Sequence, residues 1–177
     1  MKKSKRKKMI KTKLNAIIAQ NSWKKELPQV KELSEKIVEH VINDKNPSWL
    51  QNKKVVINLS LSDDEEIKEL NSEFRNLDKP TNVLSFANID DEEFDHYLKQ
   101  NQEIELGDVI IALTTMLNQS ADQEITLHDH YCHILVHAVL HLLGYDHIEP
   151  EEAQEMESEE IRILKNFNIE NPYQEKI

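Results

Sequence analysis

The sequence predicts one α+β domain in which a small mixed β-sheet packs against helices. Segments 53–61 and 107–113 have the character of strands, and they alternate along the chain with segments of helical periodicity. A chain of 177 residues is long enough for one domain with a substantial core and too short for two. No internal repeat or Gly/Ser linker divides it. These observations favour a single sheet with helices interspersed between its strands.

The chain is expected to begin with a basic arm. Residues 1–13 contain eight Lys and Arg residues and no acidic residue, which is typical of a disordered solubilising tail or of an arm that attracts anionic partners. We therefore predict a disordered arm over 1–13 and assign residues 14–177 to the single domain. The first predicted helix runs from Pro28 to Asp44. Its aliphatic stripe consists of Val30, Leu33, Ile37, Val38, Val41 and Ile42.

The next segment, 53–61, places apolar side chains at period two and is the first predicted strand. These side chains are Val55, Ile57, Leu59 and Leu61. Residues 62–65 read Ser-Asp-Asp-Glu and predict a capping box that opens a helix. Its inward side chains are predicted to be Ile67, Leu70 and Phe74. The Asp-Lys-Pro sequence at 78–80 ends this helix, and 81–87 follows as the second strand, before an acidic insertion or short helix over 90–105.

The second half of the chain contributes a buried strand and two long helices. The apolar run 107–113 is too short for a helix and predicts the buried strand. A long helix covers 126–143, with Thr126 as its cap and Gly144 as its C-terminal stop. An acidic helix over 150–167 is the last predicted element. Its predicted core side consists of Ala153, Met156, Ile163, Leu164 and Phe167.

Cysteine content and hydropathy indicate a cytoplasmic protein. Cys132 is the single cysteine, which excludes an internal disulfide and suits a reducing compartment. No apolar run approaches the roughly 18 residues of a membrane span, and no apolar stretch follows the basic N-terminus. We therefore expect neither a membrane segment nor a secretory signal. The chain has only two glycines, Gly107 and Gly144, and each is expected to mark a backbone position that requires glycine.

Charge alone argues against a nucleic-acid enzyme. The net charge is −11, but residues 14–177 hold 14 basic and 33 acidic residues, a net charge of −19. Because phosphate contacts need cations, so acidic a body is unfavourable for binding RNA or DNA. A nucleic-acid function must therefore be indicated by motifs.

Histidines concentrate on one side of the helix predicted over 126–143. At about 100° per residue, four of them fall within an arc of roughly 80°: His130, His133, His137 and His141. Residues four apart are neighbours on a helix, so either His133/His137 or His137/His141 can chelate a metal ion. The turn at Gly144 allows His147 to fold back toward the end of the helix, next to His141. The sequence therefore predicts that His137, His141 and His147 hold one metal ion.

Three histidines define a catalytic rather than a structural zinc site, because they leave a fourth position open for water. Zinc can lower the pKa of such a water to about 7. Two nearby side chains are candidates for a supporting role. His133 can face the substrate or orient a ligand, or it is a partly buried polar residue. Asp146 can orient a ligand ring or act as a base, or it serves to solvate the loop.

The segment HAVLHLLGYDH at 137–147 has the spacing H-x-x-x-H-x-x-G-x-x-H of zinc peptidases but lacks their glutamate. The position directly after the first histidine, where that glutamate would activate water and protonate the leaving amine, is Ala138. A phosphodiester depends more on neutralisation of its own negative charge, which a zinc ion and a cation can supply. The substitution thus favours phosphodiester chemistry over amide hydrolysis.

The same segment resembles the signature H-G-x-L-H-L-x-G-Y-D-H of the YbeY family, which are bacterial single-strand-specific endoribonucleases. Further motifs follow the family's order: LNSEFRNLDKPTNVLSF at 70–86, LGDVII at 106–111, and an acidic helix ending in NPY at 171–173. The resemblance covers about residues 55–173. Two positions depart from the family pattern, since Ala138 stands where the family has glycine and Asn82 where it has aspartate.

The resemblance implies a zinc-dependent endoribonuclease with roles in 16S rRNA 3′-end maturation and ribosome quality control. It implies one Zn²⁺ held by His137, His141 and His147 with a zinc-bound water as a catalytic group. The implied partners are single-stranded rRNA, the ribosome and ribosomal proteins. The family's important arginine matches Arg75, which would contact a phosphate and stabilise charge in the transition state. Without the resemblance, a salt bridge within a charged helix would explain Arg75 better.

Two other functions stay open at this point. One is a metzincin-like zinc peptidase, which shares the histidine spacing. The other is a non-catalytic, zinc-stabilised ribosome-associated factor whose acidic body binds basic ribosomal proteins. Within the endoribonuclease hypothesis, the sequence leaves open whether water or the 2′-hydroxyl of the RNA is the nucleophile.

Overall fold

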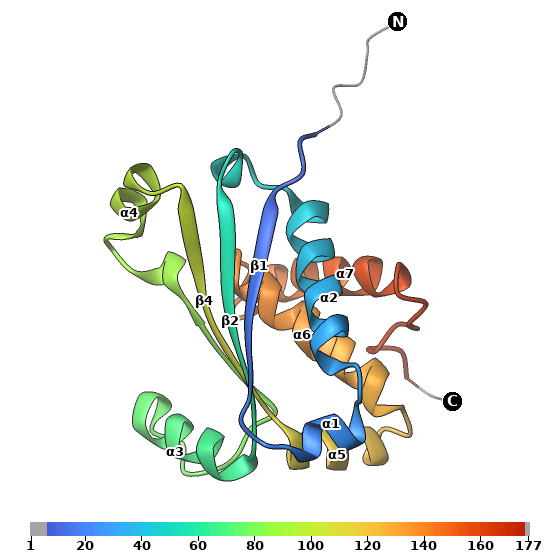
Figure 1. Cartoon of the computed structure of the whole chain (residues 1–177). Helices are drawn as coiled ribbons and strands as arrows, with labels where there is room; N and C mark the ends of the chain where they lie inside the picture. The colour runs from blue at the N-terminus through green and yellow to red at the C-terminus, as the bar shows by residue number, and fades with distance from the viewer. Residues whose placement is uncertain (1–6, 176–177) are drawn as a thin grey trace, which may run out of the picture.

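The computed structural model describes residues 7–175 and confirms the α+β class, with one mixed sheet at its centre. The sheet has the strand order β1-β2-β4-β3 (Figure 1). Strands β1 (Lys11–Ile18), β2 (Lys54–Ser62) and β4 (Glu103–Ala112) run parallel to one another. The edge strand β3 (Val83–Ala87) is antiparallel to β4.

Long helices cover one side of the sheet, and a shorter helix lies on the other side (Figure 1). The first side carries α2 (Val30–Lys45), α6 (Leu127–Leu142) and α7 (Pro150–Lys165). We refer to this side as the covered face. The opposite side, the open face, carries α3 (Asp64–Arg75). The remaining short elements are α1 (Ser22–Glu26), η1 (Ser48–Leu50), η2 (Asn88–Asp90), α4 (Phe94–Gln100) and α5 (Leu113–Asp122).

The main hydrophobic core lies between the covered face and its helices. Alternate residues of β2 turn toward it, as the period-two pattern predicts: Val55, Ile57, Leu59 and Leu61. Helix α6 is at its centre, with ten of its sixteen residues buried. A helix that is apolar on most sides is typical of such a central position. None of the helices within residues 7–175 is long and apolar enough to cross a membrane.

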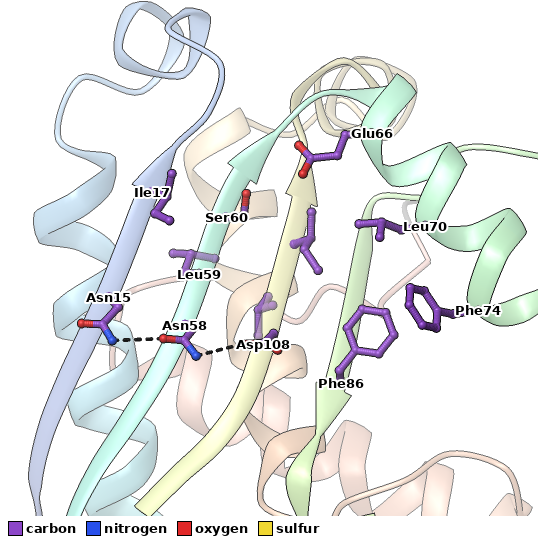
Figure 2. A pocket seen from close by; sticks show the side chains of 12 residues that line it. Asn15, Ile17, Asn58, Leu59, Ser60, Glu66, Leu70, Phe74, Phe86 and Asp108 are labelled. Carbon is purple, nitrogen blue, oxygen red and sulfur yellow. Dashed lines mark hydrogen bonds between the residues drawn. The ribbon is translucent and has the colours of Figure 1, made fainter.

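The open face carries a groove of about 470 Å³ between the strands and α3 (Figure 2). Asn15, Asn58 and Asp108 cross three neighbouring strands in a row that hydrogen bonds connect, with distances of 3.0 and 2.9 Å. Phe74 of α3 packs edge-on against Phe86 of β3, with ring centroids 5.5 Å apart. None of the three predicted metal ligands lines this groove.

Strand β1 starts inside the predicted basic arm. Residues 1–6 lie outside the described residues, but Lys11–Ile18 pairs in parallel with β2, beginning at Lys11 opposite Lys54. The side chains of β1 alternate between exposed and half-buried. Because β1 is an edge strand, its lysines keep their charges in solvent while the backbone completes the sheet. Basic composition therefore concealed a strand, and β1 overlaps the last three residues of the arm predicted over 1–13.

Two further elements differ from the prediction. Helix α5 was not predicted, and β4 begins at Glu103 rather than at residue 107. In the early part of β4, Ile104 and Leu106 are buried while Glu103 and Glu105, which alternate with them, are exposed. Period-two alternation was present there, but the high acid content of 90–105 obscured it. The acidic segment itself includes the short helix α4.

The prediction for α3 was correct in position and wrong in two details. Asp63, not Ser62, is the N-cap, and its side chain accepts a hydrogen bond of 3.0 Å from the Glu66 amide. Ile67 is buried as predicted, but Phe74 is 59% exposed. The reason is that α3 lies on the open face, where nothing covers its outer side. The helix ends at Arg75, before the Asp-Lys-Pro sequence, with Asn76 in the left-handed conformation.

Both glycines occupy positions that need them. Gly107 has a φ of 144°, and a side chain there would collide with the carbonyl oxygen of Phe86. This position follows the register shift between β2 and β4. Gly144 has a φ of 99° just beyond α6. The two conformations are ones that L-residues with a side chain rarely adopt.

Candidate metal centre

Helix α6 and the turn after it position three histidines. The helix begins as predicted at Thr126, whose hydroxyl accepts a hydrogen bond of 3.1 Å from the Asp129 amide. It ends at Leu142, and the amide of Gly144, two residues further on, donates to the carbonyl of His141 at 2.9 Å. This turn reverses the chain and carries His147 back to the end of the helix.

The ring nitrogens of His137, His141 and His147 lie within 4.8 Å of one another. The Nε2 atoms of His137 and His141 are 3.0 Å apart. The ring of His147 has its centroid 5.5 Å from that of His137 and 5.0 Å from that of His141. Of the two pairs that helix geometry allowed, the structure brings His147 to the pair His137/His141. No fourth His, Cys, Asp or Glu joins this group within residues 7–175.

The outer nitrogens of two of these rings are held by hydrogen-bond acceptors. The Nδ1 of His141 lies 2.8 Å from the carbonyl oxygen of Tyr145, and the Nδ1 of His137 contacts a carboxylate oxygen of Glu160. A carbonyl or carboxylate oxygen can only accept, so each Nδ1 carries the proton and each Nε2 keeps its lone pair. Two lone pairs that face each other suit a shared cation, so the donor set fits a metal ion.

The centre is half-buried on one side and open on the other. The side chains of His137 and His141 are half-buried and that of His147 is exposed. Burial, and after it the neighbouring His137, lowers the pKa of His141, which favours the neutral imidazole that binds metals. An open cluster of three imidazoles leaves room for a further ligand such as water, which is the arrangement found in catalytic zinc sites.

Glu160 of α7 supports the centre, and the sequence interpretation missed it. Its carboxylate is fully buried and contacts His137, His133 at 3.1 Å, and the hydroxyl of Tyr173. Burial alone would raise the pKa of Glu160, but hydrogen bonds from His133 and His137 outweigh it and hold the pKa at about 2. One signal was available, because Glu160 is a single acid on the apolar face of α7, between Met156 and Ile163.

The other histidines of α6 take different positions. His133 contacts Glu160 and lies 3.2 Å from the Tyr173 hydroxyl, outside the group of three. His130 is buried and bonds through Nε2 to the side-chain oxygen of Gln119 at 2.8 Å. Burial, and after it His133, lowers the pKa of His130 to about 4. Both residues therefore belong to the packing around the centre.

Asp146 shapes the turn that carries the third histidine. Its carboxylate accepts a hydrogen bond of 2.7 Å from the backbone amide of His147. The ring nitrogens of His137 and His141 are oriented by Glu160 and by the Tyr145 carbonyl.

Arg75 lies apart from the three histidines. It is the last residue of α3, on the open face, whereas α6 packs on the covered face (Figure 1). Its side chain is exposed and makes no hydrogen bond or ion pair with any residue in the described range 7–175. The structure therefore does not bring Arg75 into contact with the metal centre, and its guanidinium is free to bind an external anion.

The two departures from the family pattern have structural explanations. Ala138 is fully buried in the main core, so its methyl group packs against apolar neighbours. Asn82 donates a hydrogen bond of 3.0 Å to Gln119, whose oxygen also contacts His130. Neither position places a carboxylate beside the open side of the centre. The catalytic glutamate of a zinc peptidase therefore has no counterpart at 138.

The fold and this cluster define the class of the protein, a metal-dependent hydrolase. The chain belongs to the YbeY family of endoribonucleases, since the model of that family, endoribonuclease YbeY, matches residues 17–168. This result confirms the resemblance seen in the motifs and shows that the protein is an endoribonuclease. It also extends the family match toward the N-terminus, into β1.

Individual relatives agree with this assignment. Endoribonuclease YbeY of Paramagnetospirillum magneticum is 47% identical over 122 residues, which cover 69% of this chain and 73% of the relative. That of Rhodospirillum rubrum is 41% identical over 158 residues, 88% of this chain and 78% of the relative. The solution structure of TM1509 from Thermotoga maritima matches with a TM-score of 0.50 at 24% identity, covering 92% of this chain and all of the other. This last likeness shows the fold alone.

Proposed function

We propose that the protein is a zinc-dependent endoribonuclease of single-stranded RNA in which His137, His141 and His147 hold one Zn²⁺. The convergence of three imidazole nitrogens within 4.8 Å, open on the side of His147, carries this proposal. Neutral imidazoles with an open fourth position are typical of catalytic zinc. When bound there, zinc would act as a Lewis acid toward the phosphate and lower the pKa of a water to about 7.

The residues of the chain would prepare this site in three ways. Glu160 and the Tyr145 carbonyl hold the Nδ1 protons of His137 and His141, so that both Nε2 lone pairs point inward. The exposed ring of His147 borders the side from which a substrate can enter. We assign residues 14–177 to a single catalytic domain, to which β1 adds residues from Lys11 onward.

Arg75 is proposed to bind a phosphate of the RNA. Helix α3 has acidic residues in its first turn, yet Arg75 at its other end makes no ion pair within the described part of the chain. An unpaired guanidinium offers a fork of donors that matches phosphate geometry. Because it lies on the open face, Arg75 would bind a phosphate of the RNA strand other than the one at the metal centre, and would thereby hold the strand on the protein.

The biological role that we propose is 16S rRNA 3′-end maturation and ribosome quality control in the cytoplasm. Membership of the YbeY family supports this proposal. The partners would be single-stranded rRNA, the ribosome and ribosomal proteins. The net charge of −19 over residues 14–177 is unfavourable for RNA but suitable for basic ribosomal proteins, so docking on the ribosome would supply affinity that local charge does not.

Metal analysis combined with an RNA-cleavage assay on the wild type and His141→Ala tests the proposal. We expect about one zinc per wild-type chain, cleavage of single-stranded RNA, and loss of both in the variant. His128→Ala is the matched control, because His128 is exposed on the same helix and lies outside the group of three. Equal cleavage by wild type and His141→Ala would refute the proposal.

The same experiment separates the alternatives. Cleavage of peptides with sparing of RNA would indicate the metzincin-like peptidase, which the burial of Ala138 in the core disfavours. Unfolding of His141→Ala, measured by circular dichroism, would indicate the zinc-stabilised, non-catalytic factor. The ends of the RNA products identify the nucleophile. A 2′,3′-cyclic phosphate indicates attack by the 2′-hydroxyl, whereas its absence in a time course indicates attack by water.

A further inference from the structure

Glu160 is the one acidic side chain that is fully buried within residues 7–175. Burying a carboxylate is costly unless hydrogen bonds and charge replace its hydration. Glu160 meets this requirement entirely with side chains from two other segments. The main core of a domain rarely retains such a group without a structural or functional reason.

The two carboxylate oxygens have separate partners. One oxygen, Oε1, contacts the Nδ1 of His137. The other, Oε2, lies 3.1 Å from the Nε2 of His133 and accepts from the hydroxyl of Tyr173. His137 and His133 are one helical turn apart on α6, while Tyr173 belongs to the C-terminal segment after α7. A single carboxylate thus connects a ligand of the metal centre, a neighbouring turn of α6 and the C-terminal segment.

We propose that Glu160 is the positioning residue of the metal centre and that Tyr173 fixes the carboxylate in place. This inference rests on the proposed function, because it takes His137 as a metal ligand. Without an acceptor at Nδ1, the imidazole can carry its proton on either nitrogen and can rotate about its side-chain bonds. With Glu160 in place, Nδ1 keeps the proton and the Nε2 lone pair faces that of His141 at 3.0 Å.

The two half-buried ligands are held by different means. His141 is oriented by a backbone carbonyl, that of Tyr145, which no side-chain substitution removes. His137 is oriented by a charged side chain, which makes its imidazole a stronger donor to a metal ion. The orientation of His137 therefore depends on residues far away in sequence. Tyr173 and His133 hold Oε2, which leaves Oε1 directed at His137.

The test compares zinc affinity among four proteins with the full chain: wild type, Glu160→Gln, Glu160→Ala and Tyr173→Phe. Zinc dissociation constants are measured by competition with a chromophoric chelator. Loss of a hydrogen-bond partner of a metal ligand typically weakens binding about 10–100-fold. We expect a loss of this size in Glu160→Ala. Glu160→Gln should recover part of it, because its amide oxygen can still accept from His137, and Tyr173→Phe should lose roughly several-fold.

Glu159→Gln is the matched control. It carries the same substitution one residue away, where Glu159 pairs with Lys45 and Arg162 on the surface and touches no histidine. We expect its zinc affinity to equal that of the wild type. A second readout is the visible absorption of the Co²⁺-loaded proteins. A change in the orientation of His137 alters the d–d bands in Glu160→Ala, whereas general destabilisation leaves them unchanged in the folded, loaded protein.

The outcomes separate this inference from the proposed function. A wild type that binds zinc and cleaves RNA, with equal zinc affinity and Co²⁺ spectra in Glu160→Ala, would overturn the positioning role and leave the proposed function standing. A wild type that binds no zinc would overturn both. If Glu160→Ala does not fold, Tyr173→Phe decides, because Tyr173 is 41% exposed and its ring remains. Unchanged zinc affinity and Co²⁺ spectrum in Tyr173→Phe would then overturn the inference.

Discussion

The side chains on the two faces of the sheet are held in place to different degrees. On the covered face, α6 is buried and two of its histidines have their outer nitrogens fixed by Glu160 and the Tyr145 carbonyl. On the open face, Phe74 is 59% exposed and Arg75 has no partner within residues 7–175. Groups that hold a metal ion need fixed geometry, whereas groups that receive a flexible strand can stay free until it binds.

This difference leads to a general expectation about variants. Changes at the covered face should alter metal affinity, the chemical step or stability. Changes at the open face should alter substrate binding and leave the folded state nearly as stable. The four predictions below test this division, beginning with the largest expected effect.

Removal of the exposed ligand should abolish the metal centre without unfolding the protein. In His147→Ala, we expect zinc affinity to fall by more than about 100-fold, because losing a ligand should exceed the 10–100-fold cost of losing its hydrogen-bond partner. RNA cleavage should disappear with it. The unfolding free energy of the metal-free protein should change by less than about 0.5 kcal/mol, since the side chain is exposed. Zinc titration and urea unfolding measure the two quantities.

His96→Ala is a suitable control for this prediction. His96 is also exposed but lies on α4, outside the group of three. The His96→Ala variant should bind zinc and cleave RNA like the wild type. A His147→Ala protein that still binds zinc like the wild type would show that the third ligand is another residue.

Lowering the pH should reduce the free energy of unfolding, because the buried His130 on the covered face is neutral in the folded protein. Burial and His133 hold the pKa of folded His130 at about 4, while the unfolded chain takes up a proton near pH 6.5. The stability that the neutral form contributes is therefore complete above pH 6.5 and is lost as pH falls toward 4. The loss is on the order of 3 kcal/mol. Urea unfolding with a chelator present, across this pH range, measures it.

The variant His130→Gln isolates this effect. Its unfolding free energy should fall less steeply between pH 6.5 and 4 than that of the wild type, whatever its stability at neutral pH. His141 also has a lowered pKa and stays in both proteins, so its contribution cancels in the comparison. If the unfolding free energy of His130→Gln falls with pH as steeply as that of the wild type, His130 is not the cause of the lost stability.

The variant Arg75→Gln tests whether the open face contributes to substrate binding. One charge-assisted hydrogen bond to a phosphate contributes about 1.5 kcal/mol or more, so Arg75→Gln should lower kcat/KM for RNA by roughly tenfold. The position of Arg75 on the open face predicts that KM carries most of the change. Steady-state kinetics separate KM from kcat. A fall in kcat with unchanged KM would instead place Arg75 at the transition state.

Arg162→Gln is the control for Arg75. Arg162 is engaged by Asp44 and Glu159 at 2.5 Å, so it is not available for RNA. The variant can lose stability, but its KM for RNA should stay that of the wild type. A similar rise in KM for both variants would mean that general positive charge, rather than the free guanidinium of Arg75, attracts the substrate.

The sequence was informative wherever one local pattern determines one buried face. Strand β2 and helix α6 were predicted close to their observed bounds, because their apolar periodicity reports the core directly. The group of His137, His141 and His147 was predicted for the same reason. Its members lie within eleven residues, and a helix followed by a glycine turn leaves few alternative arrangements.

Other features depended on residues far apart in sequence. Lys11 and its neighbours form a strand only because β2 offers its edge some 40 residues later, and composition alone resembled a solvated arm. Glu160 is buried because His137, 23 residues earlier, and Tyr173, 13 residues later, supply its donors. The position of Arg75 at the end of α3, on the open face (Figure 1), likewise depends on how α3 packs against the sheet, which no local motif encodes.

The smallest expected effect concerns the stability of the open face itself. Phe74→Ala removes a side chain that is 59% exposed and contacts Phe86 edge-on, so it should cost about 1 kcal/mol or less. Phe94→Ala makes the same change at a residue that is 5% exposed and belongs to the main core, where about 3–5 kcal/mol is typical. Urea unfolding of both variants measures the contrast. If Phe74→Ala costs as much as Phe94→Ala, α3 is held as firmly as the core helices, and the open face is not the less constrained of the two. If the small value is found, α3 can shift at little cost when RNA binds beside Arg75, which is the freedom that a strand-receiving face requires.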